Sequence, residues 1–198
     1  MKDHMNHDAY PDNYIRGILN SVKSIAMVGA SPVNVRPSYF AFKYLAQRGY
    51  DMIPVNPGHV GNNLLGKPFV ASLADIGRPV DMIDIFRNSS HIGPVVDAAL
   101  QMTPLPKVIW MQLGARDDLA AAKAEAAGLK VVMNRCPKIE YGRLSSEISW
   151  MGVNSRTLSS KRAPMPSQGM RLSLNRMSLG GGETAASDRA AKNRNDPA

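Results

Sequence analysis

The sequence has a single cysteine, Cys136, so no disulfide can form within the chain. This excludes the disulfide-dense class of small secreted domains and predicts a reducing compartment, the cytoplasm. No segment has the roughly 18 consecutive apolar residues of a membrane span. The N-terminus, MKDHMNHDAYPDN, also lacks the apolar run of a secretory signal. We therefore expect a soluble cytoplasmic protein with no membrane partner.

The net positive charge is small in the part of the chain that can fold, although the net charge of the whole is +8. Residues 156–198 carry eight Lys and Arg against three Asp and Glu, which leaves a net +3 for residues 1–155. This small excess suits a small anionic ligand and argues against nucleic acid as the partner of the folded part.

Five short apolar runs recur along the chain, and segments with helical patterning separate them. Val, Ile and Met dominate the runs, as in strands that are buried on both faces of a parallel sheet. The alternation predicts an α/β fold, a single Rossmann-like doubly wound parallel sheet of five strands. The predicted strands are 24–30, 51–57, 80–86, 107–114 and 129–136, and the predicted helices between them are 37–49, 90–102 and 116–128.

Composition divides the chain into three parts. Residues 1–23 are expected to form an N-terminal helix that packs on the domain, and residues 24–150 form the domain itself. Residues 151–198 are rich in Ser, Arg, Gly and Pro and are predicted to be a disordered basic tail. The tail is either a solvated appendage or a contact for RNA, anionic lipid or a partner protein.

The loop after the first predicted strand, GASPVNVRPSY, has only Gly29 where a dinucleotide fingerprint has three glycines. In a doubly wound sheet this turn meets the N-terminus of the next helix, where free N–H groups attract phosphate. Ser31 and Arg36 add a hydroxyl and a positive charge. The loop is therefore predicted to hold phosphate along a path different from that of a dinucleotide loop.

The second predicted strand lacks the acidic residue that nicotinamide and flavin binders place at its end. It ends IPVNPGHVG, with Asn56 in that region. A carboxylate suits a ribose diol and repels a phosphorylated ribose. Its absence points away from NAD and leaves two ligands phosphorylated on the ribose, NADP and coenzyme A.

Six segments occur in order with little insertion: VGASPVNVRPSYFAFKYL, GYDMIPVNP, LLGKPFVASLADI, VDMIDIFR, VIWMQLG and GLKVVMNRCPKIEYGRL. Together they resemble the small stand-alone CoA-binding proteins, whose Rossmann-like domain is related to the N-terminal domain of the succinyl-CoA synthetase alpha subunit. The resemblance covers about residues 15–145. It implies a coenzyme A or acyl-CoA site at the carboxyl ends of the first strands, with phosphate contacts from Gly29, Ala30, Ser31 and Arg36, with Val55, Asn56 and Pro57 beside the adenosine end, and with Phe86 and Arg87 lining the crevice.

Two further segments end predicted strands on the ligand side. Arg87 can pair with phosphate, or it can make a surface salt bridge or cap a neighbouring helix. In WMQLGA, Gln112 and Gly114 can offer an amide and bare backbone to the pantetheine arm, although Gly114 can equally be a turn residue.

Cys136 is the candidate for chemistry, because Arg135, Lys138 and Arg143 surround it in the sequence and cations lower a thiol pKa. Such a thiol would suggest acyl transfer or a mixed disulfide with coenzyme A. A nucleophile also needs a base within reach, and none of the four histidines is an evident partner. His4 and His7 are expected in a frayed start, and no metal site is predicted. The competing interpretation of Cys136 is packing.

The sequence therefore predicts a protein that binds coenzyme A or acyl-CoA, as a binding, carrier or regulatory protein with a possible protein partner in acyl-CoA metabolism. Whether it catalyses a reaction stays open. The alternatives are a small NADP-dependent or redox enzyme and a module in which the tail binds RNA or protein. The chain lacks the grasp domain and phosphorylated histidine segment of the acyl-CoA synthetases that it resembles, so a ligase is not expected.

Overall fold

The structure, a computed structural model, describes residues 6–145, and the predicted tail, residues 151–198, lies outside them. Five strands form a parallel sheet in the order β2-β1-β5-β6-β7, which confirms the predicted doubly wound α/β fold. The strands are β1 (Ser24–Val28), β2 (Asp51–Val55), β5 (Met82–Ile85), β6 (Val108–Met111) and β7 (Lys130–Val132).

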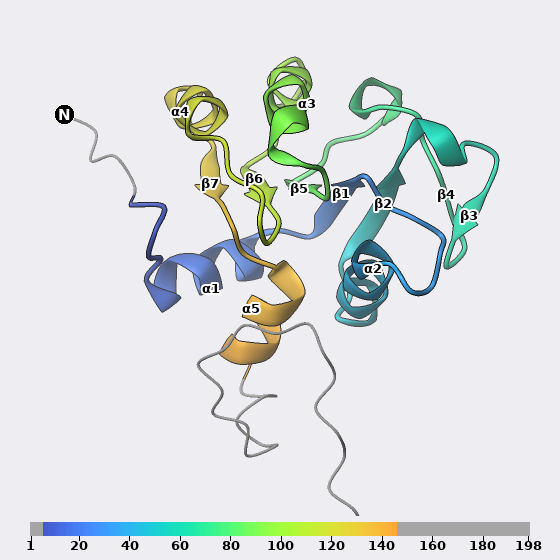
Figure 1. The fold of residues 1–198 in the computed structure, drawn as a ribbon, viewed down its shortest axis with the longest axis horizontal. Helices are drawn as coiled ribbons and strands as arrows, with labels where there is room; N and C mark the ends of the chain where they lie inside the picture. Colours follow the sequence, from blue (N-terminus) through green and yellow to red (C-terminus); the bar gives the residue numbers. More distant parts are fainter. Residues whose placement is uncertain (1–5, 146–198) are drawn as a thin grey trace, which may run out of the picture. The chain divides into compact units, whose positions relative to one another are not determined.

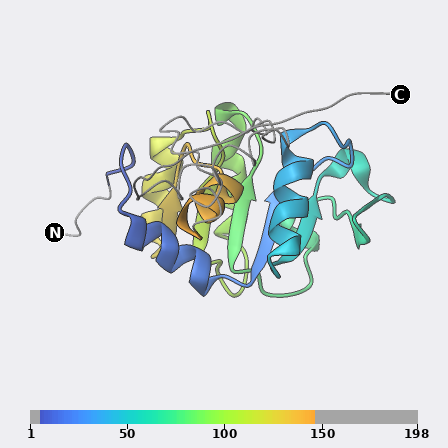
Figure 2. The same ribbon diagram turned by 90° about the horizontal axis from the view of Figure 1, so that it is seen from below.

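Helices cover both faces of this sheet (Figure 1). The helices α3 (Ile92–Ala99) and α4 (Asp118–Ala126) pack on one face, and α1 (Asp12–Ser21), α2 (Pro37–Gln47) and α5 (Pro137–Leu144) pack on the other. In Figure 2 the helices α1, α5 and α2 lie in front of the strands, and α3 and α4 lie behind them. Among the helices of residues 6–145, none is long and apolar enough to cross a bilayer.

Successive strand residues point to opposite faces of the sheet, so each strand contributes to two cores. In β1, Ala26 and Val28 face the α3 and α4 layer, whereas Ile25 and Met27 face the α1, α2 and α5 layer. Burying one large apolar side chain stabilises a fold by about 1.5–3 kcal/mol. Because both faces of the central strands are covered, their sequences are continuously apolar.

A β-hairpin and the last helix were not predicted. The two-stranded hairpin of β3 (Asn63–Leu64) and β4 (Lys67–Pro68) turns at Leu65 and Gly66, which both have positive φ. Leucine rarely adopts that conformation, so no sequence pattern indicates this turn. The helix α5 contains Gly142 and only eight residues, too few for a clear helical period.

The expectation that His7 lies in a frayed start is wrong, because His7 is buried. Its Nε2 lies 3.2 Å from Glu125 Oε1, and its Nδ1 shares a hydrogen bond of 2.7 Å with the Tyr10 hydroxyl. The same hydroxyl accepts a hydrogen bond from Met133 N–H. These contacts fasten the N-terminal segment to α4 and to the end of β7.

Candidate functional site

The carboxyl ends of β1, β5 and β6 lie level with one another. Val28 is paired with Ile85, and Ile85 with Met111. The residues that follow these three, Gly29, Phe86 and Gln112, therefore begin the loops of one edge. The chain turns to opposite faces after β1 and β5, since α2 covers one face and α3 the other. In open α/β sheets such a switch point is where ligands bind.

Gly29 makes the switch point possible, because two loops approach each other closely there. Its φ is +87°, and a Cβ at this position would lie 2.3 Å from the Phe86 carbonyl oxygen. Its N–H donates to Val55 O at 2.9 Å, and Phe86 N–H donates to Val28 O at 2.8 Å. A residue other than glycine would be both strained and overlapped at this point.

The β1–α2 loop leaves backbone donors unused at this edge. The N–H groups of Ala30, Ser31 and Ser38 donate no hydrogen bond to any of residues 6–145. Ser31 Oγ accepts a hydrogen bond from Val33 N–H at 3.2 Å, which leaves its own hydroxyl hydrogen available to another acceptor. Arg36 is the residue that precedes α2, with Pro37 in its first turn. Free N–H groups before a helix N-terminus favour an anion.

Two arginines at the switch point have no side-chain partner in the part of the chain that the structure describes. Within the described part of the chain, the side chains of Arg36 and Arg87 make no hydrogen bond and no ion pair, and both residues are exposed. The Arg87 stem passes over Gly29, with its Cδ 3.3 Å from where a Cβ would be. A phosphate at this edge would meet two cations that do not have to leave another partner.

Asn56 ties the end of β2 to the same loop. Its Nδ2 donates to Ala30 O at 2.8 Å, and its Oδ1 accepts from Gly58 N–H at 3.0 Å. The predicted site residue Asn56 therefore holds the loop in place through both ends of its side chain. Pro57 is exposed beside it, and Val55 is buried.

A cavity of about 200 Å³ opens on the α3 side of this edge. Its walls are mainly apolar and include Val28 and Val55, the last residues of β1 and β2. Pro57 and Ser72 close it on the β2 side, and Val95 of α3 closes it on the other. An apolar slot with a phosphate-binding loop at its mouth is a common form of nucleotide site.

A second cavity, of about 400 Å³, lies at the opposite edge of the sheet. It is lined by segment 73–79, which precedes β5, and by segment 98–104, which precedes β6. Its one arginine, Arg78, is paired with Asp51. Although this cavity is larger, it lies at the amino ends of the strands and away from the loop donors and unpaired arginines.

Comparison with known proteins shows the family of this chain. The family model described as the CoA binding domain matches residues 23–142. The chain belongs to the CoA-binding domain family.

The relatives match over most of their own length and over about two thirds of this chain. The uncharacterized protein YneT of Bacillus subtilis (strain 168) is 35% identical over 127 residues, which are 64% of this chain and 91% of YneT. The structure of cell-free ID.343 from Thermus thermophilus has 36% identity and a TM-score of 0.64, covering 68% of this chain and 99% of that one. A hypothetical protein from Pyrococcus horikoshii OT3 has 36% identity and a TM-score of 0.65, covering 73% and 99%.

Two predicted site residues of this CoA-binding domain, Gln112 and Gly114, lie in the loop that follows β6. Gln112 is buried, and its Nε2 donates to Asp84 Oδ1 at 2.8 Å. Gly114 has a φ of +77° and donates its N–H to Asn134 Oδ1 at 2.8 Å, so it is at least a turn residue. Asp84, which no sequence pattern singled out, is fully buried in the central strand β5.

The expectation of a lowered pKa at Cys136 is wrong. Burial raises the pKa of the Cys136 thiol to about 11, and the nearby Asp84 carboxyl adds to this shift. The backbone N–H groups of Ile139 and Lys138 oppose it only in part. The guanidinium groups of Arg135 and Arg143 have other partners: Arg143 pairs with Glu140 and Asp12, and Arg135 donates to the carbonyl oxygens of Asn134 and Asp8. A catalytic role for Cys136 stays a prediction, and the thiol is neutral near pH 7.

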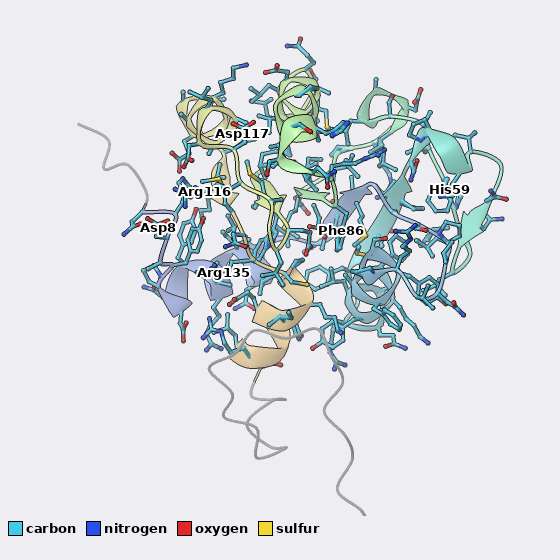
Figure 3. All side chains as sticks on the ribbon, viewed as in Figure 1. Asp8, His59, Phe86, Arg116, Asp117 and Arg135 are labelled. Carbon is cyan, nitrogen blue, oxygen red and sulfur yellow. The ribbon has the colours of Figure 1, made fainter. Side chains whose placement is uncertain are left out.

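The edge beyond β6 and β7 is closed by ion pairs (Figure 3). Arg116 binds Asp118 through its Nε and Nη2, and Asp8 through its Nη1. Arg135 donates to the carbonyl oxygen of Asp8 at 3.2 Å, and its guanidinium lies over the Tyr10 ring. The N-terminal segment thus binds the arginines of this part of the edge.

Among residues 6–145, no three His, Cys, Asp or Glu side chains gather to hold a metal ion.

Proposed function

We propose that this protein binds coenzyme A or an acyl-CoA at the β1/β5 switch point. The observation that carries the proposal is the pair of arginines without internal partners, Arg36 and Arg87, beside the unused N–H groups of the β1–α2 loop. Membership of the CoA-binding domain family supports the choice of ligand.

In this proposal the ligand phosphates lie against Ala30, Ser31 and the start of α2, where N–H donors and positive charge coincide. The adenosine end takes the apolar cavity beside Val55 and Pro57. The pantetheine arm runs along the edge past Phe86 toward Gln112 and Gly114. Adjacent strands are about 4.8 Å apart, so Gln112 is roughly 10 Å from Gly29 along this row.

We further propose a binding, carrier or regulatory role in the cytoplasm, with a protein of acyl-CoA metabolism as partner. A neutral thiol supports this role better than acyl transfer, because the thiolate is the nucleophilic form. NADP, the alternative ligand, remains an outcome of the test below.

The test is calorimetric titration of coenzyme A, acetyl-CoA, NAD and NADP into the full chain and into Arg36→Ala. We expect saturable binding of coenzyme A, weakened roughly 10- to 100-fold in the variant because a charged hydrogen-bond partner is lost. The matched control is Arg78→Ala, which removes the same charge at the opposite edge and should leave the affinity unchanged.

Binding of NADP without coenzyme A would keep the phosphate loop and overturn the ligand. No binding of any of the four would overturn the proposed function.

A further inference from the structure

Three strand ends bring polar side chains together on the side of the sheet that α5 covers. Asp84 of β5 is fully buried, with Met27 and Trp110 as its neighbours in β1 and β6. Gln112 follows β6, and Cys136 precedes α5. A carboxyl group in the centre of an apolar layer is costly and calls for a function or a fully satisfied network.

The network around Asp84 is not fully satisfied. Its Oδ1 accepts a hydrogen bond from Gln112 Nε2 at 2.8 Å, whereas its Oδ2 is buried and has no hydrogen-bond partner among residues 6–145. An ionised carboxylate can only accept hydrogen bonds. The NH₂ end of the Gln112 amide must therefore turn inward, and its carbonyl oxygen must turn away from Asp84.

The amide oxygen of Gln112, Oε1, belongs to the residue that directly follows β6 at the ligand edge. It accepts no hydrogen bond from residues 6–145 and, unlike Asp84 Oδ2, it is not sealed from solvent. Gln112 N–H donates to Ile85 O, so the residue stands directly beside Phe86 in the row that begins at Gly29. An oriented hydrogen-bond acceptor thus lies on the path assigned to the pantetheine arm.

We propose that Asp84 is a positioning residue that holds the Gln112 amide with Oε1 toward the crevice, where Oε1 accepts a hydrogen bond from an amide N–H of the pantetheine arm. This inference rests on the proposed function. It assigns to the site a preference for an amide-bearing ligand, which a nucleotide without such an arm does not satisfy.

Protonation of Asp84 changes what the cluster can do. Burial raises the pKa of the Asp84 carboxyl to about 7, and the Gln112 hydrogen bond opposes the shift. Once protonated, the carboxyl can donate as well as accept, so it no longer dictates the orientation of the amide. Of the groups around it, the Cys136 thiol stays neutral in this range, and Glu140 of α5 is held by Arg143 and Arg135. Affinity for coenzyme A should therefore fall as the pH drops below 7.

The test compares two ligands on the full chain: coenzyme A and its nucleotide half, adenosine 3′,5′-bisphosphate, which has no amide arm. Gln112→Leu and Asp84→Leu should each weaken the binding of coenzyme A roughly 3- to 10-fold, because one oriented hydrogen bond is lost. Neither should change the affinity for the bisphosphate. Asp84→Asn carries an amide that, like the protonated carboxyl, can donate as well as accept, so it does not dictate the orientation of Gln112. At pH 8 it should bind coenzyme A about as weakly as wild type does at low pH, and its affinity should not depend on the protonation of residue 84.

Equal weakening of both ligands would reveal a structural role alone and overturn the inference. So would unchanged coenzyme A affinity in Gln112→Leu, or the same pH profile in Asp84→Asn as in wild type. The ligand's own phosphate titrates alike for both proteins and cancels in that comparison. Wild type that binds neither ligand would overturn the proposed function itself.

Discussion

Two stretches of the same sheet edge use arginine in opposite ways. Beyond β6 and β7, Arg116 and Arg135 are engaged by the N-terminal segment through Asp8. At the β1/β5 switch point, Arg36 and Arg87 have no partner among residues 6–145. The position of a charge along the edge therefore does not by itself define a binding site for an anionic ligand. A cation that is already paired must lose that partner before it binds a ligand, whereas an unpaired one loses only water.

The largest effect on stability is expected from Gly29→Ala at the β1/β5 switch point, where the arginines are unpaired within residues 6–145. The added Cβ would overlap the Phe86 carbonyl oxygen in a backbone conformation that strains any L residue. We expect a loss of about 3–5 kcal/mol in the free energy of unfolding, measured by urea denaturation. Gly49→Ala is the matched control, because Gly49 has a φ of +88° and no atom near its Cβ position. It should cost about 1–2 kcal/mol. Equal losses would mean that the close approach at Gly29 does not matter.

Cys136 lies beyond β7, in the stretch of the edge that the N-terminal segment closes. It should be unreactive because it is buried. Its raised pKa leaves little thiolate at neutral pH. We expect alkylation of the native chain at pH 7.5 to be on the order of 100-fold slower than in urea, where the thiol has its ordinary pKa. As the chain has one cysteine, mass spectrometry reads this rate directly. Equally fast reaction in the native state would revive Cys136 as a nucleophile.

Arginine substitutions test the comparison itself. Arg87→Ala should weaken the binding of coenzyme A roughly 10-fold or more, because it removes a cation from the switch point. A calorimetric titration measures this change. Arg116→Ala removes the same charge from the closed stretch and should change the affinity by less than about twofold. A larger loss of affinity in Arg116→Ala than in Arg87→Ala would place the ligand beyond β6 and contradict the proposed site.

The smallest effect is expected from His7→Ala, which loosens the N-terminal segment. Loss of the contacts to Glu125 and Tyr10 should lower the free energy of unfolding by about 1–2 kcal/mol. Coenzyme A affinity should not change, since these contacts lie beyond the switch point. A parallel loss of affinity would show that the closed stretch takes part in binding.

Periodicity was enough to predict the five strands and four of the helices, because parallel strands are continuously apolar and the helices are bounded by Pro and Gly. The hairpin turn at Leu65 was hidden, since nothing in LLGK signals a leucine with positive φ. His7 was misjudged because its burial depends on Glu125 and Tyr10, which only the fold brings near.

The site was predictable to the extent that it follows strand ends. Gly29 and Arg87 come after strands, and parallel strands place their carboxyl ends together. Asp84 was missed because it is a single acidic residue in an otherwise apolar strand. The pKa of Cys136 was misjudged because burial, which the sequence neighbours do not reveal, outweighs the effect of the nearby cations. Local sequence shows which charges are near along the chain, and it does not show which are paired across it.

The most direct test of the central claim is a crystal structure of the full chain with coenzyme A bound. The account predicts the ligand diphosphate beside the N–H groups of Ala30 and Ser31, within hydrogen-bond distance of Arg36 or Arg87. A diphosphate bound at Arg116 and Arg135, or in the cavity beside Arg78, would contradict it.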